Sequence, residues 1–172
     1  MRVNENDNWR SFRHRNFQIL FSANAVSNIG SWAQRIAQDW LVLELSHNNG
    51  TYLGLVTALQ FVPVLFFSLH GGALADRFDK RKVLIATNVG GGLSAGILGL
   101  LVTTHHVQLW HVFLLAFALG VSNAVDAPVR QSFIAEVVGH TDIANAVSLN
   151  SANFNAGRLI GPALSGASIA VF

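Results

Sequence analysis

The chain has 172 residues, of which 51% are hydrophobic and 12% are charged. Soluble globular domains carry about 25% charged residues, so this chain has too little charge to coat a water-facing surface, and its apolar content excludes a disordered polypeptide. Zero cysteines exclude disulfides and thiolate metal sites. We therefore expect a protein that resides in a lipid bilayer. The net charge is only +2, and the basic residues form short clusters between apolar runs. Such clusters indicate loops anchored at a membrane surface, so we expect no nucleic-acid partner.

Formal charges divide the sequence into long uncharged segments. Residues 16–34, 45–75 and 83–125 comprise 19, 31 and 43 residues without a formal charge. A helix needs about 20 residues to cross the hydrocarbon core, so the second segment accommodates one crossing and the third accommodates two. Segments this long and continuously apolar favour helices over the short alternating strands of a membrane barrel.

The segments predict an all-α integral membrane protein. Residues 1–16 are expected to form a cytoplasmic N-terminal segment, and residues 17–172 a transmembrane bundle. The five expected helices are residues 17–45, 51–75, 83–103, 109–127 and 144–172. Residues 129–141 have an amphipathic pattern and are expected to form a separate helix at the membrane interface.

Lysine and arginine gather in alternate connections. Arginines precede the first expected helix, a dense basic cluster joins the second to the third, and Arg130 follows the fourth. The other two connections have no lysine or arginine. Because basic loops remain in the cytoplasm, we expect a cytoplasmic N-terminus.

The connection between the second and third expected helices has a specific pattern. Glycines lie near the end of the second helix, and an acidic residue and then a cluster of basic residues follow them. A basic anchor alone does not explain Asp76, which directly follows an apolar helix. The run resembles the signature loop of the major facilitator superfamily. The matching residues are Gly72, Leu74, Ala75, Asp76, Arg77, Lys80, Arg81 and Leu84. Asp79 stands where the family has glycine, and aspartate is one of the few residues that tolerate a left-handed turn.

A second run supports the same family. It resembles the glycine and proline motif that exporters of this superfamily carry in their fifth helix. The matching residues are Gly157, Gly161, Pro162 and Gly166. Small residues let helix backbones approach closely in lipid. Residues 38–45 and 149–163 also resemble bacterial drug-efflux antiporters related to macrolide and siderophore exporters.

The resemblance implies a twelve-helix transporter of two six-helix halves, of which this chain supplies the first five helices. It implies export of a small amphipathic molecule, such as a drug or a siderophore, in exchange for protons across the bacterial inner membrane. The residues themselves show no recurring set of nucleophile, base and orienting group, and no metal-ligand spacing among histidines beyond His105, His106 and His111, so we expect no enzymatic activity, cofactor or metal. Five helices cannot enclose a pathway that both halves line, so we expect a fragment whose partner is the missing C-terminal half. An uptake symporter of the same fold and a membrane scaffold that transports nothing remain alternatives.

The resemblance also implies a cytoplasmic gating motif. In the resembling transporters the loop aspartate contacts a helix terminus in the other half and an arginine at the cytoplasmic end of the fourth helix. Asp76 matches this aspartate, and Arg130 is the expected arginine. Interaction with a helix terminus is worth roughly 0.3 to 1 kcal/mol when exposed. We therefore expect Asp76 and Arg130 to couple energetically.

Polar residues recur on one face of the first expected helix, since three- and four-residue spacing aligns them. They are Asn24, Asn28, Ser31, Arg35 and Asp39. Charges inside a membrane are costly and usually face a cavity or a partner. Two hypotheses remain open: Arg35 and Asp39 neutralise each other, or Asp39 takes part in proton coupling while Arg35 steadies its charge or binds an anionic group of the substrate.

Arg158 is the lone formal charge in the last expected helix. Its depth costs about 2.5 to 3.5 kcal/mol on insertion scales, so it needs a carboxylate, a carbonyl or water. Two interpretations remain open for Arg158. It bonds to neighbouring helices, or it lines the pathway with Asn28, Arg35 and Asp39.

Overall fold

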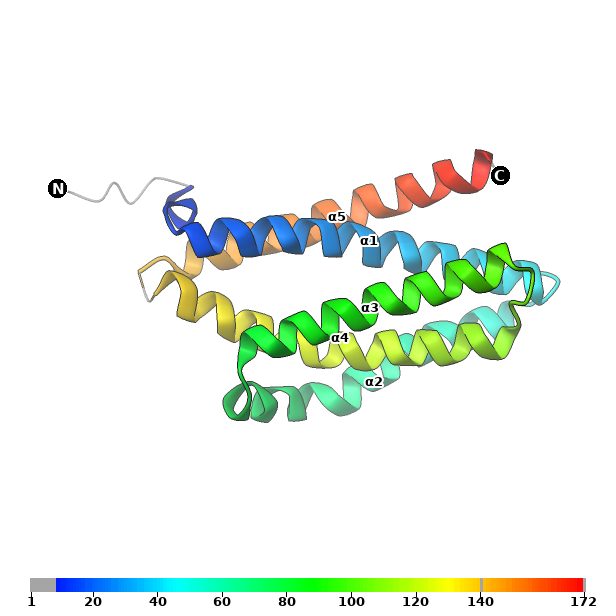
Figure 1. Ribbon diagram of the computed structural model, residues 1–172, viewed down its shortest axis with the longest axis horizontal. Coiled ribbons are helices and arrows are strands. Elements are labelled where there is room, and N and C mark those ends of the chain that lie inside the picture. Colours follow the sequence, from blue (N-terminus) through cyan, green and yellow to red (C-terminus); the bar gives the residue numbers. More distant parts are fainter. Residues whose placement is uncertain (1–8, 140, 172) are drawn as a thin grey trace.

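The chain folds into five long helices and one short 3-10 helix over residues 9–139 and 141–171, the part that the computed structural model describes (Figure 1). Side chains are described in this part except at residues 68–77, 170 and 171. The elements are η1 (Arg10–Arg13), α1 (Arg15–Leu45), α2 (Gly50–Arg77), α3 (Lys80–Thr103), α4 (Leu109–Val138) and α5 (Ile143–Val171). The predicted all-α class is confirmed.

Three of the helices contain a segment that is long and apolar enough to cross a membrane. These segments are Gly50–Phe67, Lys80–Thr103 and Leu109–Val138. Helices α1 and α5, with 31 and 29 residues, are each roughly 45 Å long, which exceeds a hydrocarbon core of about 30 Å. These two helices are not among the three candidate membrane spans because their polar side chains lower the mean hydropathy. Several of these polar side chains face other helices.

Helix α4 runs past its predicted end at residue 127. It continues through Pro128 to Val138, so the expectation of a separate amphipathic helix over residues 129–141 is wrong. Proline removes one backbone hydrogen bond, a loss that helices packed among neighbours tolerate. The extension is held by burial of Val129, Ile134 and Val138. Val129 packs with Leu84 of α3, while Ile134 and Val138 pack against α1 and α5.

The connection between α2 and α3 consists of Phe78 and Asp79. The Asp79 carboxylate accepts a hydrogen bond from the backbone N–H of Lys82 at 3.2 Å and so caps α3. Its φ is −59°, so a left-handed turn at Asp79 is excluded. Aspartate fits this position because an N-cap side chain satisfies one of the free N–H groups at a helix start.

The helices form two groups. Helix α1 packs along α5, while α2 and α3 both pack on α4 (Figure 1). The start of α1, the α2–α3 connection and the α4–α5 connection lie at one end of the bundle. The α1–α2 and α3–α4 connections lie at the other end. Basic residues therefore lie near this end at the start of α1 and at the start of α3, whereas Arg130, expected in the α4–α5 connection, lies within α4.

Two glycines of α5 set its distance from α1. A Cβ atom added at Gly157 would lie 2.8 Å from Asn28 Cβ, and one added at Gly161 would lie 2.6 Å from Trp32 Cβ. Real side chains do not approach this closely, so the contact needs glycine at both positions. A Cβ atom added at Gly166, farther along the same helix, would meet nothing within 4 Å among the described residues.

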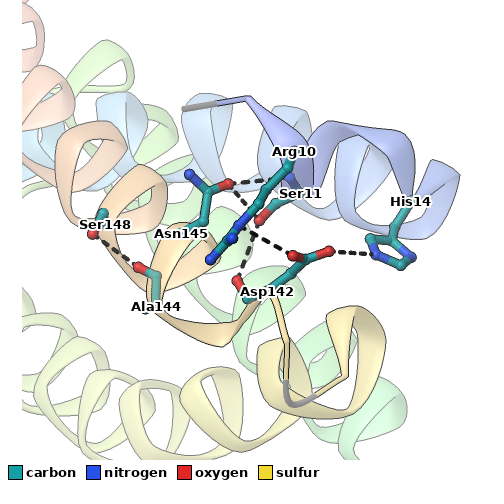
Figure 2. A network of polar contacts seen from close by, with 7 residues as sticks. All are labelled: Arg10, Ser11, His14, Asp142, Ala144, Asn145 and Ser148. Carbon is teal, nitrogen blue, oxygen red and sulfur yellow. Dashed lines mark hydrogen bonds and ion pairs between the residues drawn. The ribbon is translucent and has the colours of Figure 1, made fainter. Parts of the chain in front are cut away.

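A polar network joins η1 and the start of α1 to the start of α5 (Figure 2). Arg10 Nε lies 3.1 Å from Asp142 Oδ1, and His14 Nε2 lies 3.2 Å from Asp142 Oδ2. The Ser11 hydroxyl donates to Asn145 Oδ1 at 2.7 Å. The α1–α5 pair is thus fixed at one end by this network and in its middle by the glycine contacts.

Replacing Gly161 with alanine is expected to lower stability by about 1 to 3 kcal/mol, because the added methyl overpacks the α1 backbone. Gly166→Ala is the matched control: it is expected to leave stability unchanged or raise it by up to ~1 kcal/mol, since alanine favours a helix over glycine. Thermal unfolding of the purified protein in detergent measures both. Equal effects of the two substitutions would contradict the packing described.

Candidate functional site

A cleft of about 980 Å³ runs between the α1–α5 pair and the group formed by α2, α3 and α4. All five helices contribute side chains to it. The amide side chains in its lining are Asn28, Gln34, Asn88, Asn123, Gln131, Asn150 and Asn155. Ligand pockets have volumes of roughly 300 to 1,000 Å³. The cleft is therefore large enough for a small molecule and can form hydrogen bonds with it.

Two arginines of the cleft lie against one tryptophan. The guanidinium carbon of Arg35 lies 4.8 Å from the ring centroid of Trp32 and 4.9 Å from that of Phe61. The guanidinium carbon of Arg158 lies 5.7 Å from the same Trp32 centroid. These distances are within the range of cation–π attraction. The contact of Gly157 and Gly161 with α1 is what brings Arg158 to Trp32.

Asp39 lies one turn beyond Arg35 on α1 and interacts with it electrostatically. The ion pairs within 4.0 Å among the described residues include neither Arg35 nor Arg158. Oδ1 of Asp39 is buried without a hydrogen-bond partner among the described residues. Arg35 and Asp39 are therefore not in contact as a close ion pair, but they interact electrostatically, so both sequence hypotheses for them remain open. Of this pair only Arg35 lines the cleft.

A second charged group lies in the half of the cleft nearer the basic end. Arg130 Nε donates to Asp126 Oδ2 at 2.7 Å, and Thr87 Oγ1 of α3 donates to Asp126 Oδ1 at 2.7 Å. The arginine and aspartate side chains are 13% and 15% exposed. Nη1 of Arg130 is buried without a partner among the described residues. The partner predicted for Arg130 is Asp76, whose side chain lies outside the described residues.

The predicted gating motif is described only in part. Gly72, Asp76 and Arg77 belong to the stretch of α2 whose side chains are not described. Lys80 forms an ion pair with Glu136 of α4. The side chain of Arg81 is exposed. The start of α3 is thus attached to the C-terminal end of α4 by an ion pair that the sequence analysis did not predict.

The predicted exporter motif divides into two parts. All four residues lie within α5. Gly157 and Gly161 contact α1, whereas Gly166 is exposed and Pro162 is half-buried. Asn28 lies at the contact with Gly157 and also lines the cleft. The first part of the motif therefore shapes the cleft by fixing the register of α5 on α1.

Sequence reasoning missed several polar contacts between helices. Asp126 carried a usable signal, since its four-residue spacing from Arg130 predicts a helical ion pair. The buried hydrogen bond from Gln60 Nε2 to Gln38 Oε1, 3.2 Å long, joins α2 to α1. Neither this hydrogen bond nor the ion pairs of Asp142 with Arg10 and His14 can be predicted from a local sequence pattern, because the partners meet only after the helices pack.

The sequence profile that describes transmembrane secretion effectors matches residues 6–172. The match covers almost the whole chain, including all five helices. No solved structure matches the chain.

Three relatives show the range of similar proteins. The chain is 33% identical over 156 residues to the staphyloferrin A transporter of Staphylococcus aureus, covering 90% of this chain and 39% of that protein. It is 28% identical over 159 residues to the multidrug efflux pump Tap of Mycolicibacterium fortuitum, covering 88% and 38%. It is 21% identical over 160 residues to macrolide efflux protein A of Streptococcus pyogenes, covering 92% and 38%. The chain thus spans about two fifths of the length of these relatives.

Replacing Asp126 with asparagine is expected to destabilise the protein by about 1 to 3 kcal/mol, because it leaves the buried Arg130 guanidinium without its carboxylate. Glu136→Gln is the control. Its ion pair with Lys80 is 57% exposed on the glutamate side, so its loss is expected to cost ~0 to 1 kcal/mol. Thermal unfolding in detergent compares the two variants. A larger loss from Glu136→Gln would contradict this ranking.

Proposed function

The chain belongs to the transmembrane secretion effector family of the major facilitator superfamily, and we propose that it forms the N-terminal part of a proton-coupled exporter of a small amphipathic molecule. Members of this family are membrane transporters and not enzymes. The observation that carries the proposal is the polar cleft, which all five helices line inside a bundle whose exposed surface is rich in large apolar side chains. The relatives named for siderophore, drug and macrolide transport support export.

The apolar surface fits a lipid bilayer. On α3 the exposed residues repeat at three- and four-residue spacing, as one face of a helix requires. They are Ile85, Val89, Leu93, Ile97 and Leu100. The partners that we propose are therefore the bilayer, a small-molecule substrate and protons. The second wall of the pathway belongs to the C-terminal half that the twelve-helix architecture implies.

We propose the bacterial inner membrane as the location, with the N-terminus in the cytoplasm. The support is that basic residues lie at the start of α1 and at the start of α3, beside the α2–α3 connection, and both lie at the same end of the bundle (Figure 1). Basic segments remain on the cytoplasmic side of a membrane.

The cytoplasmic gate that we propose uses Arg130. Its Nε is occupied by Asp126, while its buried Nη1 has no partner among the described residues. A buried unsatisfied donor is costly, so a second acceptor at Nη1 would stabilise the state that supplies it. Asp76 is the acceptor that we propose, with Gly72, Arg77, Lys80 and Arg81 forming the rest of the motif. In this scheme, making and breaking the Asp76–Arg130 contact biases the pathway between its two open states.

Asp39 is the residue that we propose for proton coupling. Its Oδ1 is buried without a hydrogen-bond partner among the described residues, and Arg35 lies one turn away. An intramembrane carboxyl that lacks a fixed partner can exchange a proton when the pathway opens. Asn28 and Arg158, both in the lining of the cleft, would contact the substrate.

Asp39→Asn is expected to abolish export that a proton gradient drives, because asparagine cannot exchange a proton. The measurement is export from cells that express the full-length protein, with erythromycin as a basic probe and carboxyfluorescein as an acidic one. Glu44→Gln, at the exposed end of the same helix, is the control and is expected to export normally. Full activity of Asp39→Asn would remove the coupling role.

The same assay separates the alternative functions. Accumulation of a probe inside the cells would indicate an uptake symporter, and movement of neither probe would indicate a scaffold. Both results would contradict the proposed export.

The orientation can be tested by labelling, because the chain has no cysteine. Phe78→Cys, in the α2–α3 connection, is expected to react with a membrane-impermeant maleimide only after the cells are opened. His105→Cys, in the α3–α4 connection, is expected to react in intact cells. The opposite pattern would place the N-terminus outside.

A further inference from the structure

We propose that the cleft binds an organic anion with at least two carboxylates on an apolar or aromatic body. Arg35 and Arg158 bind its carboxylates, and Trp32 contacts its body. The proposal rests on the proposed transport function and specifies its substrate class. Arg35 comes from α1 and Arg158 from the middle of α5, so the site exists only when these helices are packed together.

Among the described residues, the lining of the cleft supplies no carboxylate that pairs with these two arginines. The charged side chains that line the cleft are Arg35, Asp126, Arg130 and Arg158. Asp126 and Arg130 neutralise each other as an ion pair. Neither remaining arginine has a carboxylate within ion-pair distance among the described residues, although Asp39 acts on Arg35 from one turn away. A positive charge retained inside a membrane bundle needs a compensating anion, and the substrate can supply it.

The geometry of the two guanidinium groups favours carboxylates. Arg35 lies 4.8 Å and Arg158 5.7 Å from the centroid of the Trp32 ring. A guanidinium group that contacts a ring face keeps its in-plane N–H donors available, and these match the two oxygens of a carboxylate. Two such groups against one indole can bind two acidic groups of the same small molecule.

The lining also accommodates the body of such a molecule. Trp32 and Phe61 offer aromatic surface beside the arginines. The amide side chains of Asn28, Asn155 and Gln34 offer hydrogen bonds around it. A bare inorganic anion would leave the aromatic surface unused. The combination of two cations, aromatic rings and several amides therefore indicates an amphipathic polycarboxylate.

The test is binding of carboxyfluorescein, an aromatic dicarboxylate, to the full-length protein in phosphatidylcholine nanodiscs, which contain no anionic lipid. Fluorescence polarisation gives the affinity. Arg35→Gln and Arg158→Gln are each expected to weaken binding about tenfold or more, as loss of a hydrogen bond to a charged group does. Arg158→Lys keeps the charge and is expected to bind better than Arg158→Gln.

Arg15→Gln, at the exposed start of α1, is the matched control, because it removes the same charge outside the cleft. It is expected to bind carboxyfluorescein like the unaltered protein. Unchanged binding by both Arg35→Gln and Arg158→Gln would overturn the proposal. Inorganic phosphate that competes as well as tricarballylate, a tricarboxylate, would overturn the assignment to carboxylates.

The export assay separates this proposal from the proposed function. Proton-driven export of erythromycin without binding of carboxyfluorescein would overturn the anion site and leave the transport function intact. Export of neither probe would instead overturn the transport function.

Discussion

The direct contact between the backbones of α1 and α5 is the constraint on which the rest of the structure depends. Glycine at positions 157 and 161 lets α5 approach Asn28 and Trp32 more closely than any side chain would permit. In a bilayer, where lipid tails are as apolar as leucine, close backbone packing supplies the attraction that hydrophobic burial supplies in water. The same contact fixes the register that places Arg158 beside the Trp32 ring and so adds a second arginine to the one that α1 contributes there.

The bundle separates two environments. Large apolar side chains are exposed on its outer surface, whereas the cleft collects amides, arginines and one compensated ion pair. Such a distribution is costly unless water or a polar ligand enters the cleft, because buried polar groups need partners. Asp39 Oδ1 and Arg130 Nη1, which have no hydrogen-bond partner in the described part of the chain, belong to the two residues that we propose for proton coupling and for gating. In the proposed mechanism, these atoms gain and lose partners as the protein switches between states.

The sequence predicts much of the fold, because long uncharged segments in a bilayer must be helices. It fails where tertiary packing decides. Pro128 reads as a helix end, yet α4 continues to Val138 because its extension is buried. The spacing of Arg35 and Asp39 places them one turn apart, but it does not show that the Arg35 guanidinium group also lies against Trp32 and Phe61. Pairs such as Lys80–Glu136 are far apart in the sequence, so no local pattern reveals them. The sequence indicates Arg35 and Arg158 as candidate functional residues, but it does not predict that both lie against the Trp32 ring.

Chemical cross-linking between α1 and α5 tests the central contact most directly, since the chain has no cysteine of its own. Asn24 of α1 contacts Asn150 of α5, with 3.4 Å between Nδ2 and Oδ1, and cysteine at these two positions adds no atom at Gly157 or Gly161. A protein with Asn24→Cys and Asn150→Cys is expected to be cross-linked by a short thiol-specific reagent, which is read after proteolysis between the helices. A protein with Asn24→Cys and Gly166→Cys is expected to remain uncross-linked. Failure of the first pair, or equal cross-linking of both, would contradict the account.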